Sequence, residues 1–263
     1  MIRLIAVDMD GTLLTGHTEI HPENVKAVRH AMERGVVFVV ASGRMVRSCS
    51  RVLTAHELPW AHIIGANGCE IAGADGNIVE QHFMDSDTAR ETLRIYEEHG
   101  LHACLFSEKA VVYPTKEAMM RIAGSYAKTR PYGDDAMNEA LAGNCYKTFC
   151  IMLPGQEQAF EAAKRACAEL PGLENTSSWH NNFEVMPAGV NKGVALAKLA
   201  GRLGIPAAEI MAFGDSDNDI SMLEFAGFGF AMGNAGEDVK ARAKYLAGRN
   251  DAGGVAQGIY LHV

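Results

Sequence analysis

The sequence predicts an α/β protein, a doubly wound, Rossmann-like parallel sheet with an α+β domain inserted into it. Residues 1–7, 36–41 and 210–213 are short apolar runs rich in branched aliphatic side chains, which is typical of strands buried on both faces. Helical patterns follow these runs, and strands that alternate with helices favour a parallel sheet. A segment of about a hundred residues between the second and third runs is long enough for a small domain.

The first part of the chain predicts the first half of the sheet. After the strand at 1–7, a polar loop leads to a helix that begins near Pro22 and ends at Gly35. The strand at 36–41 and a further helix follow. A short third strand and a hairpin are expected at 61–64, 70–72 and 77–79, since two short strand patterns there flank a glycine-rich turn.

The middle of the chain predicts the inserted domain, with boundaries that place 1–84 and 187–263 in the core and 85–186 in the insertion. Residues 130–143, which contain Pro131 and Gly133, are expected to be polar and irregular. A charged amphipathic helix is expected at 87–99 and further helices at 115–128 and 156–170. Strands are expected at 101–106, 110–113, 146–153, 173–177 and 183–186.

The alternating pattern returns after residue 190 and completes the sheet. The expected elements are helices at 192–203, 220–225 and 237–243, strands at 210–213, 229–232 and 245–246, and a final helix from residue 253.

Composition limits the possible functions. The 263 residues carry a net charge of −8 with no basic cluster, which argues against nucleic-acid binding. No apolar segment approaches the ~20 residues of a membrane span, and the N-terminus lacks the features of a secretory signal. Six scattered cysteines without metal-site spacing are best explained as buried thiols in a reducing compartment, so we expect a cytoplasmic protein.

Two carboxylates, Asp8 and Asp10, come where the first strand should end, and Gly11 follows them. In open α/β sheets ligands bind beyond the carboxyl ends of the strands, so these side chains point to a site. Two such acids repel each other and are costly to desolvate unless a cation compensates. A simple turn that ends the strand is the alternative for this pair taken alone.

Three further groups lie at expected strand ends or helix starts. Ser42-Gly43 follows the second strand and precedes a helix, a setting that suits an anion, although Ser42 alone is more often a helix cap. Asp215 leads a loop that also holds Asn218 and Asp219, and alone it could be a solvated turn. Lys192 begins a helix and alone would be taken as a surface charge.

Together these residues suit a magnesium ion and a phosphoryl group. Asp8 and Asp215 could each supply a carboxylate oxygen to Mg²⁺, and the Asp10 carbonyl a third ligand. Lys192, the Ser42 hydroxyl and backbone N–H groups would stabilise the phosphate charge. A carboxylate that attacks phosphorus gives an aspartyl-phosphate, and a second carboxyl can move the protons.

Four segments, in this order, resemble the motifs of the haloacid dehalogenase superfamily of phosphatases. They are Asp8-Met9-Asp10-Gly11-Thr12, Ser42-Gly43-Arg44, Lys192 in Val190-Asn191-Lys192-Gly193, and Gly214-Asp215-Ser216-Asp217-Asn218-Asp219. The length and place of the insertion resemble the α/β cap of the Cof-like subfamily, as do Asn67-Gly68 and Glu184-Val185-Met186-Pro187.

The resemblance implies a role for each residue. Asp8 is similar to the nucleophile and a Mg²⁺ ligand, and Asp10 to the general acid and base. The Asp10 carbonyl and Asp215 would complete the metal ligands. The phosphate would be held by Met9, through its N–H group, and by Ser42, Gly43, Lys192 and Asn218. Thr12 would orient the loop, and Asp219 would support metal-bound water or Lys192.

The resemblance implies Mg²⁺-dependent hydrolysis of small phosphorylated metabolites such as sugar phosphates. Two alternatives stay open: a phospho-accepting signalling domain of the receiver type, and a sugar-phosphate mutase. The substrate, the oligomeric state and the pathway do not follow from the sequence. Candidates for substrate contacts, chosen by position or chemistry, are Arg44, Trp179, His180 and Asn182.

Overall fold

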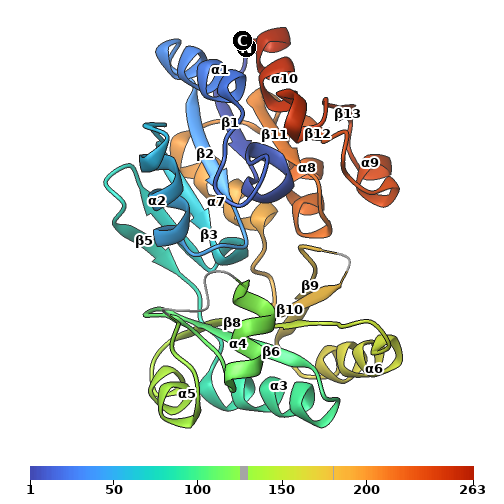
Figure 1. The fold of residues 1–263 in the computed structure, drawn as a ribbon. Coiled ribbons are helices and arrows are strands. Elements are labelled where there is room, and N and C mark those ends of the chain that lie inside the picture. The colour runs from blue at the N-terminus through green and yellow to red at the C-terminus, as the bar shows by residue number, and fades with distance from the viewer. Residues whose placement is uncertain (125–129, 180) are drawn as a thin grey trace. The chain divides into compact units, whose positions relative to one another are not determined.

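The computed structural model describes residues 1–124, 130–179 and 181–263 (Figure 1). Its internal contacts divide the chain into two compact units. Residues 1–81 and 191–263 form the core unit, and residues 82–190 form the inserted unit. Each unit has its own sheet and its own buried cluster of apolar side chains.

An eight-stranded sheet forms the centre of the core unit, in the order β13-β12-β11-β1-β2-β3-β4-β5. Neighbouring strands are parallel from β13 to β3, and β4 and β5 add an antiparallel hairpin at one edge. The α/β fold and the hairpin agree with the prediction. The strands are β1 (Leu4–Val7), β2 (Val37–Ala41), β3 (His62–Gly65), β4 (Glu70–Gly73), β5 (Ile78–Gln81), β11 (Ile210–Gly214), β12 (Phe228–Ala231) and β13 (Tyr245–Leu246).

Helices cover both faces of this sheet. One layer consists of α1 (Pro22–Glu33), α2 (Val46–Ala55) and α10 (Gly254–His262). The other consists of α7 (Lys192–Leu203), α8 (Ile220–Phe225) and α9 (Glu237–Arg242). The helix predicted at 192–203 therefore has the bounds of α7.

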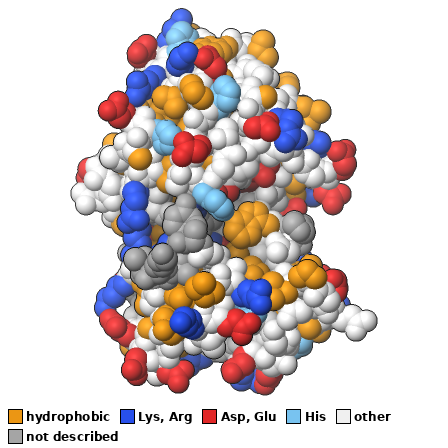
Figure 2. All heavy atoms as spheres, in the orientation of Figure 1, with side chains coloured by type: hydrophobic (Ala, Val, Ile, Leu, Met, Phe, Trp, Pro, Cys, Tyr) orange, Lys and Arg blue, Asp and Glu red, His pale blue; other side chains and the backbone are white. Residues whose placement is uncertain are grey.

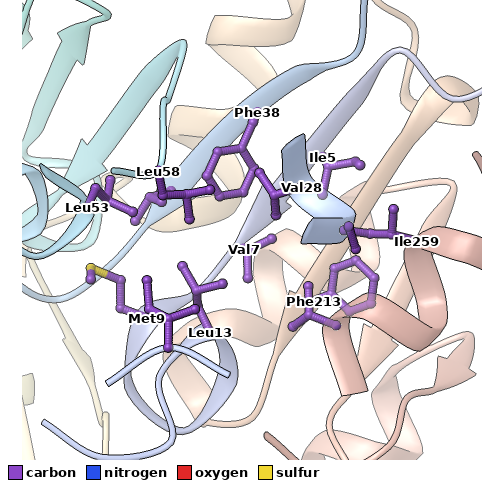
Figure 3. Close-up of a cluster of buried hydrophobic side chains, with 14 of the residues drawn as sticks. Ile5, Val7, Met9, Leu13, Val28, Phe38, Leu53, Leu58, Phe213 and Ile259 are labelled. Carbon is purple, nitrogen blue, oxygen red and sulfur yellow. The ribbon is translucent and has the colours of Figure 1, made fainter. Parts of the chain in front are cut away.

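Alternation along β1 explains why the strand is a continuous apolar run. Ile5 and Val7 pack toward α1 and α10, whereas Leu4 and Ala6 pack toward α7 and α8. Figure 3 shows the first of these clusters, in which Ile5 and Val7 lie near Phe213 of β11. Because both faces of the strand are buried, the side chains on either face have to be apolar.

The register of the parallel strands brings their carboxyl ends together. Val7 is aligned with Phe213 of β11 and with Val40 of β2. The Asp8 N–H donates to the Phe213 carbonyl at 3.0 Å, so Asp8 continues the same alignment beyond the strand. The residues that directly follow β1, β2 and β11 in the sequence therefore lie together at the carboxyl ends of these parallel strands.

The inserted unit contains a five-stranded antiparallel sheet in the order β7-β6-β8-β10-β9. Helices α3, α5 and α6 pack on one of its faces, where the Tyr96 hydroxyl meets the buried Thr148 hydroxyl at 2.9 Å. The elements are α3 (Ser86–Glu98), β6 (His102–Ser107), β7 (Val111–Val112), α4 (Lys116–Ala123), α5 (Asp134–Leu141), β8 (Cys145–Ile151), α6 (Glu157–Ala168), β9 (Leu173–Thr176) and β10 (Asn182–Pro187).

Helix α5 corrects the prediction that residues 130–143 are irregular. Gly133, with φ of 91°, lies at the N-terminal end of the helix, which begins directly after it at Asp134. Met137, Ala140 and Leu141 are spaced so that they share one helical face, and this face is buried in the cluster of the inserted unit. Three apolar residues that pack on a sheet are enough to stabilise one short helix in a mostly polar stretch.

Helix α4 begins where the sequence predicts it. The Thr115 side chain accepts a hydrogen bond from the Ala118 N–H at 3.1 Å and caps the helix. The helix ends at Ala123, and Gly124 follows with φ of 53°. The rest of the helix expected at 115–128 falls mostly on residues 125–129, which lie outside the described residues.

The mixed charge of the surface and the burial of the cysteines are as the composition predicts. Figure 2 shows acidic and basic side chains interspersed over the visible face. All six cysteines are free and buried. Within the described ranges, none of the helices is long and apolar enough to cross a membrane.

Replacing Phe213 by alanine should cost about 3–5 kcal/mol of unfolding free energy, because it empties a fully buried site. The ring stacks on Phe230 with centroids 4.9 Å apart, so the contact is lost as well. Urea denaturation measures the change. The control is Leu261→Ala on α10, where the side chain is 77% exposed and the expected change is within about 0.5 kcal/mol. Equal losses in the two variants would contradict the assignment of this core.

Candidate active site

The loop after β1 turns sharply around Gly11. Residues Met9–Leu13 form a single wide turn, and the Leu14 N–H donates to the Met9 carbonyl at 2.8 Å. Gly11 has φ of 78°, and a Cβ atom at this position would overlap the Asp215 carboxylate. The close approach of the first and fourth motifs therefore requires glycine here. The Met9 side chain is buried in the apolar cluster, so only its backbone can face a ligand.

Two asparagines from the end of the chain fix this loop. Asn234 Nδ2 donates to the Gly11 carbonyl and Asn250 Nδ2 to the Leu14 carbonyl, both at 2.8 Å. The Asn250 N–H in turn donates to Asn234 Oδ1 at 2.9 Å. Neither residue could be predicted from the sequence, because nothing in their local sequence marks them as partners of a loop more than two hundred positions away.

Lys192 is the centre of the charged cluster. Its ammonium lies 2.6 Å from Asp8 Oδ1 and 2.6 Å from Asp219 Oδ1, and its side chain is fully buried. The Asn191 side chain caps α7 by accepting from the Val194 N–H at 2.9 Å, so Lys192 leaves the first turn of the helix toward Asp8. The interpretation of Lys192 as a solvated surface charge is wrong.

The loop after β11 places the other two acids. Asp219 Oδ2 accepts from the backbone N–H groups of Asp215 and Ser216, at 2.9 and 3.1 Å, while its Oδ1 accepts from Lys192. Asp219 therefore links Lys192 of α7 to the backbone of this loop. Asp215 is held from the first loop, because the Thr12 hydroxyl donates to its Oδ1 at 2.8 Å.

Burial and mutual repulsion perturb these acids. Burial raises the pKa of Asp8 well above its usual value, the Asp219 carboxylate adds to the rise, and Lys192 acts against it. Burial, followed by the Asp219 charge, raises the pKa of Asp215 to about 7. For Lys192, burial alone would lower the pKa, but the carboxylates of Asp219 and Asp8 outweigh it and raise the pKa above its usual value.

The charge balance fits a divalent cation. Ligand oxygens of Asp8, Asp215 and Asp219 all lie within 4.8 Å of one another, and one ammonium compensates only part of their charge. Asp219 already accepts from the Lys192 ammonium and from two backbone N–H groups, whereas Asp215, among the described residues, accepts only from the hydroxyls of Thr12 and Ser216. In the described part of the chain, no hydrogen bond reaches the second oxygen of Asp8. Asp8 and Asp215 are thus the acids best placed to bind a hard cation such as Mg²⁺.

The loop after β2 differs from the prediction in one respect. We expected Ser42 and Gly43 at a helix N-terminus, but α2 begins only at Val46, so its first turn lies beyond them. Ser42 stays next to the strand end, where its N–H donates to the Ile64 carbonyl at 2.8 Å and its Oγ accepts from the Arg44 N–H at 3.2 Å. The backbone of this loop, rather than the N-terminus of a helix, therefore holds Ser42 and Gly43 next to the strand end.

Arg44 is bound to the second carboxylate of the first motif. Its Nε and Nη2 donate to the two oxygens of Asp10, at 2.7 and 2.5 Å, and Nη2 also donates to the His17 carbonyl at 2.8 Å. We considered Arg44 as a substrate contact and missed this pair. A bidentate guanidinium fixes the direction of a carboxylate more strictly than an ammonium can. Arg44 thus orients Asp10.

Asn218 lies in the loop that follows β11 and is buried. Its Nδ2 donates to Asn67 Oδ1 at 3.1 Å. Asn67 belongs to a stretch that we noted only for its likeness to the Cof-like subfamily.

Two of the other substrate candidates are described. Asn182 is buried, and its Oδ1 accepts from the N–H groups of Ser178 and Trp179, at 3.2 and 2.6 Å, so it shapes its own loop. Trp179 is half exposed and meets Phe149 edge to face. His180 lies outside the described residues.

A parallel sheet that brings acids, a buried lysine and a hydroxyl together at its strand ends is suited to binding a charged ligand. The family model of the haloacid dehalogenase-like hydrolases matches residues 5–259, so the chain belongs to this family. The family predicted from the motifs is confirmed.

Individual relatives support the assignment to this family. The chain is 33% identical to the 5-amino-6-(5-phospho-D-ribitylamino)uracil phosphatase YcsE of Bacillus subtilis (strain 168), over 98% of this chain and 94% of that protein. It is 31% identical to the pyridoxal phosphate phosphatase YbhA of Escherichia coli (strain K12), over 99% and 98%. A solved haloacid dehalogenase-like hydrolase from B. subtilis superposes with a TM-score of 0.86 at 29% identity, over the whole of both chains. The fold class is confirmed, and the chain is a phosphatase, a phosphoric monoester hydrolase.

Replacing Lys192 by methionine should destabilise the protein by about 3–5 kcal/mol, because it leaves buried carboxylates without their cation. The loss should be larger at about pH 8 than at about pH 6, since the carboxylates can take up protons at the lower pH. Chemical denaturation at both pH values measures it.

The control for this variant is Lys198→Met on the same helix, where the side chain is 45% exposed and pairs with Glu80. An exposed pair is worth about 1 kcal/mol or less. A loss at Lys192 no larger than that at Lys198 would contradict the shared-ammonium arrangement.

Proposed function

We propose that the protein is a Mg²⁺-dependent phosphatase of small phosphorylated metabolites that forms an aspartyl-phosphate on Asp8. The observation that carries this proposal is the position of Asp8 at the strand end, with one oxygen on Lys192 and the other without a hydrogen bond in the described structure. The family and the named phosphatases among the relatives support the reaction class.

Magnesium would be held by the carboxylates of Asp8 and Asp215 and by the backbone carbonyl of Asp10. When bound, the ion supplies positive charge that offsets the crowded carboxylates and polarises a phosphoryl oxygen. Burial first, and the nearby Asp219 carboxylate second, raise the pKa of Asp215, and a bound cation would offset both effects.

The first step forms a bond between an Asp8 oxygen and phosphorus while the bond from phosphorus to the leaving oxygen breaks. Asp10, as the carboxylic acid, donates its proton to that leaving oxygen. In the second step Asp10, now a carboxylate, accepts a proton from water as the water oxygen attacks phosphorus. The bond to Asp8 breaks, inorganic phosphate leaves, and both aspartates return to their starting states.

The remaining motif residues would hold the phosphoryl group. Lys192 offers its charge, Ser42 its hydroxyl and Asn218 its amide, while Met9 and Gly43 offer backbone N–H groups. Thr12 and Asp219 support the site indirectly, because they hold Asp215 and Lys192 in place.

We further propose that the inserted unit, predicted as a cap domain at 85–186, selects the substrate. The strand-end residues of the core unit all serve the phosphate, the cation or proton transfer, so they cannot distinguish one leaving group from another. The two relatives are named for different phosphorylated metabolites, which is the behaviour expected when a common catalytic unit carries a variable second domain. The free cysteines support the expected cytoplasmic location.

The variant Asp8→Asn should lose phosphatase activity by about a thousandfold or more, because an amide of the same shape cannot attack phosphorus. Release of inorganic phosphate from p-nitrophenyl phosphate and from a panel of phosphorylated metabolites measures this. The control is Asp238→Asn, an exposed acid in the first turn of α9, which should keep wild-type activity.

Wild-type turnover in Asp8→Asn would overturn the proposal. A wild-type protein that moves phosphate between hydroxyls without releasing it would instead indicate the mutase, and one that stays phosphorylated for hours the receiver-type domain.

Binding of Mg²⁺ should strengthen as the pH rises from about 6 to about 8. Below the pKa of Asp215, about 7, the ion has to displace a proton from this carboxyl, and above it the ligand is already ionised. The affinity should therefore change by up to about tenfold per pH unit on the acid side and level off above it. Calorimetric titration of the metal-free protein measures it, with Asp215→Asn as the control that binds weakly at every pH. An affinity that does not vary with pH would contradict the assignment of Asp215 as a ligand.

A further inference from the structure

The turn after β3 contains the most unusual backbone of the core unit. Ala66 and Asn67 follow each other with φ of 47° and 57°, in the left-handed region that side chains other than glycine rarely adopt. Among the described residues, the only other non-glycine residue with positive φ is the exposed Glu57. Two such residues in succession, both buried, persist only where the surrounding contacts hold them.

The unusual conformation turns two N–H groups toward the loop of the second motif. The Ala66 N–H donates to the Arg44 carbonyl at 2.7 Å, and the Asn67 N–H donates to the Ser42 carbonyl at 2.9 Å. These bonds fix the backbone on both sides of Gly43, which would face the phosphate.

The same turn reaches the other two phosphate-binding segments. Asn67 Oδ1 accepts from Asn218 Nδ2 at 3.1 Å, with both side chains buried. Gly68 lies against α7, where a Cβ atom would come within 2.8 Å of the Asn191 carbonyl, next to Lys192. One short turn therefore contacts the segments of Ser42, Lys192 and Asn218.

We propose that Asn67 is a positioning residue that orients the Asn218 amide toward the phosphoryl group. This inference rests on the proposed function. A carboxamide has an NH₂ end and an oxygen end, and only the NH₂ end stabilises an anion. Because Asn67 Oδ1 accepts one N–H of Asn218, the second N–H keeps a fixed direction and the Asn218 oxygen is kept away from the phosphate.

The residue type at position 67 matches this task. Asparagine is among the few residues that tolerate the left-handed conformation, and its side-chain oxygen accepts a hydrogen bond without adding charge. An aspartate would also accept the bond but would repel a phosphate nearby.

The test is Asn67→Gly, which permits the same backbone and removes only the side chain. We expect kcat/KM with p-nitrophenyl phosphate to fall about tenfold, and the affinity for inorganic phosphate, measured by calorimetry, to fall by a similar factor. The control is Glu57→Gly, the same kind of change at an exposed left-handed position, which should leave both quantities unchanged.

Combination with Asn218→Ala separates orientation from a general structural effect. Removing the Asn218 side chain should cost about tenfold in the wild type but less than about twofold in Asn67→Gly, where the amide is already misplaced. In Asn67→Asp, which keeps the acceptor, it should again cost about tenfold, although the starting affinity for phosphate is weaker. This rescue also keeps the test decisive if Asn67→Gly folds poorly.

The inference is overturned if Asn67→Gly matches the wild type, or if Asn218→Ala costs about tenfold in every background. Either result leaves the proposed function intact, because the wild type still releases phosphate. A wild type that neither hydrolyses p-nitrophenyl phosphate nor binds inorganic phosphate overturns both the inference and the proposed function.

Discussion

The structure of the site depends on one ammonium group that two buried carboxylates share. Lys192 reaches Asp8 on one side and Asp219 on the other, and Asp219 in turn holds the loop of Asp215. Removal of the lysine would leave a cluster of acids that the interior cannot solvate. One ammonium does not balance all the nearby carboxylates, and this excess of negative charge supports the proposal that the site binds a cation and, together with it, a phosphate.

The parallel sheet explains how residues far apart in the chain meet there. Strands β1, β2 and β11 are parallel and aligned. Asp8, Ser42 and Asp215, each the first residue after its strand, therefore lie together at the carboxyl ends of these strands. Two glycines allow the segments to approach, since a Cβ at Gly11 would overlap Asp215 and one at Gly68 would crowd the backbone before Lys192. The core unit supplies the chemistry, and we assign the choice of substrate to the inserted unit.

Local patterns were enough to predict the sheet and helix α7, because buried strands and amphipathic helices are visible in a short window. The strand-end acids are visible in the same way, but the full set of ten residues proposed for the site also needed the resemblance to the family, and it stays a prediction. What depends on the path of loops was not predictable. The pairing of Arg44 with Asp10 and the support from Asn234 and Asn250 join loops that have no common pattern. Helix α5 was missed because Pro131 and Gly133 indicate irregular structure. The three residues that the helix buries stabilise it only through contacts within the inserted unit, which a local pattern does not show.

The proposed aspartyl-phosphate is tested most directly by identifying the phosphorylated residue during turnover. The wild type would be mixed with p-nitrophenyl phosphate and Mg²⁺, quenched in acid within a single turnover, digested and examined by mass spectrometry. We expect one phosphoryl group on the peptide that contains Asp8. It should be lost on treatment with hydroxylamine, which cleaves acyl phosphates, and it should be absent from Asp8→Asn. Phosphate release without any phosphorylated peptide, or a phosphoryl group on another residue, would contradict it.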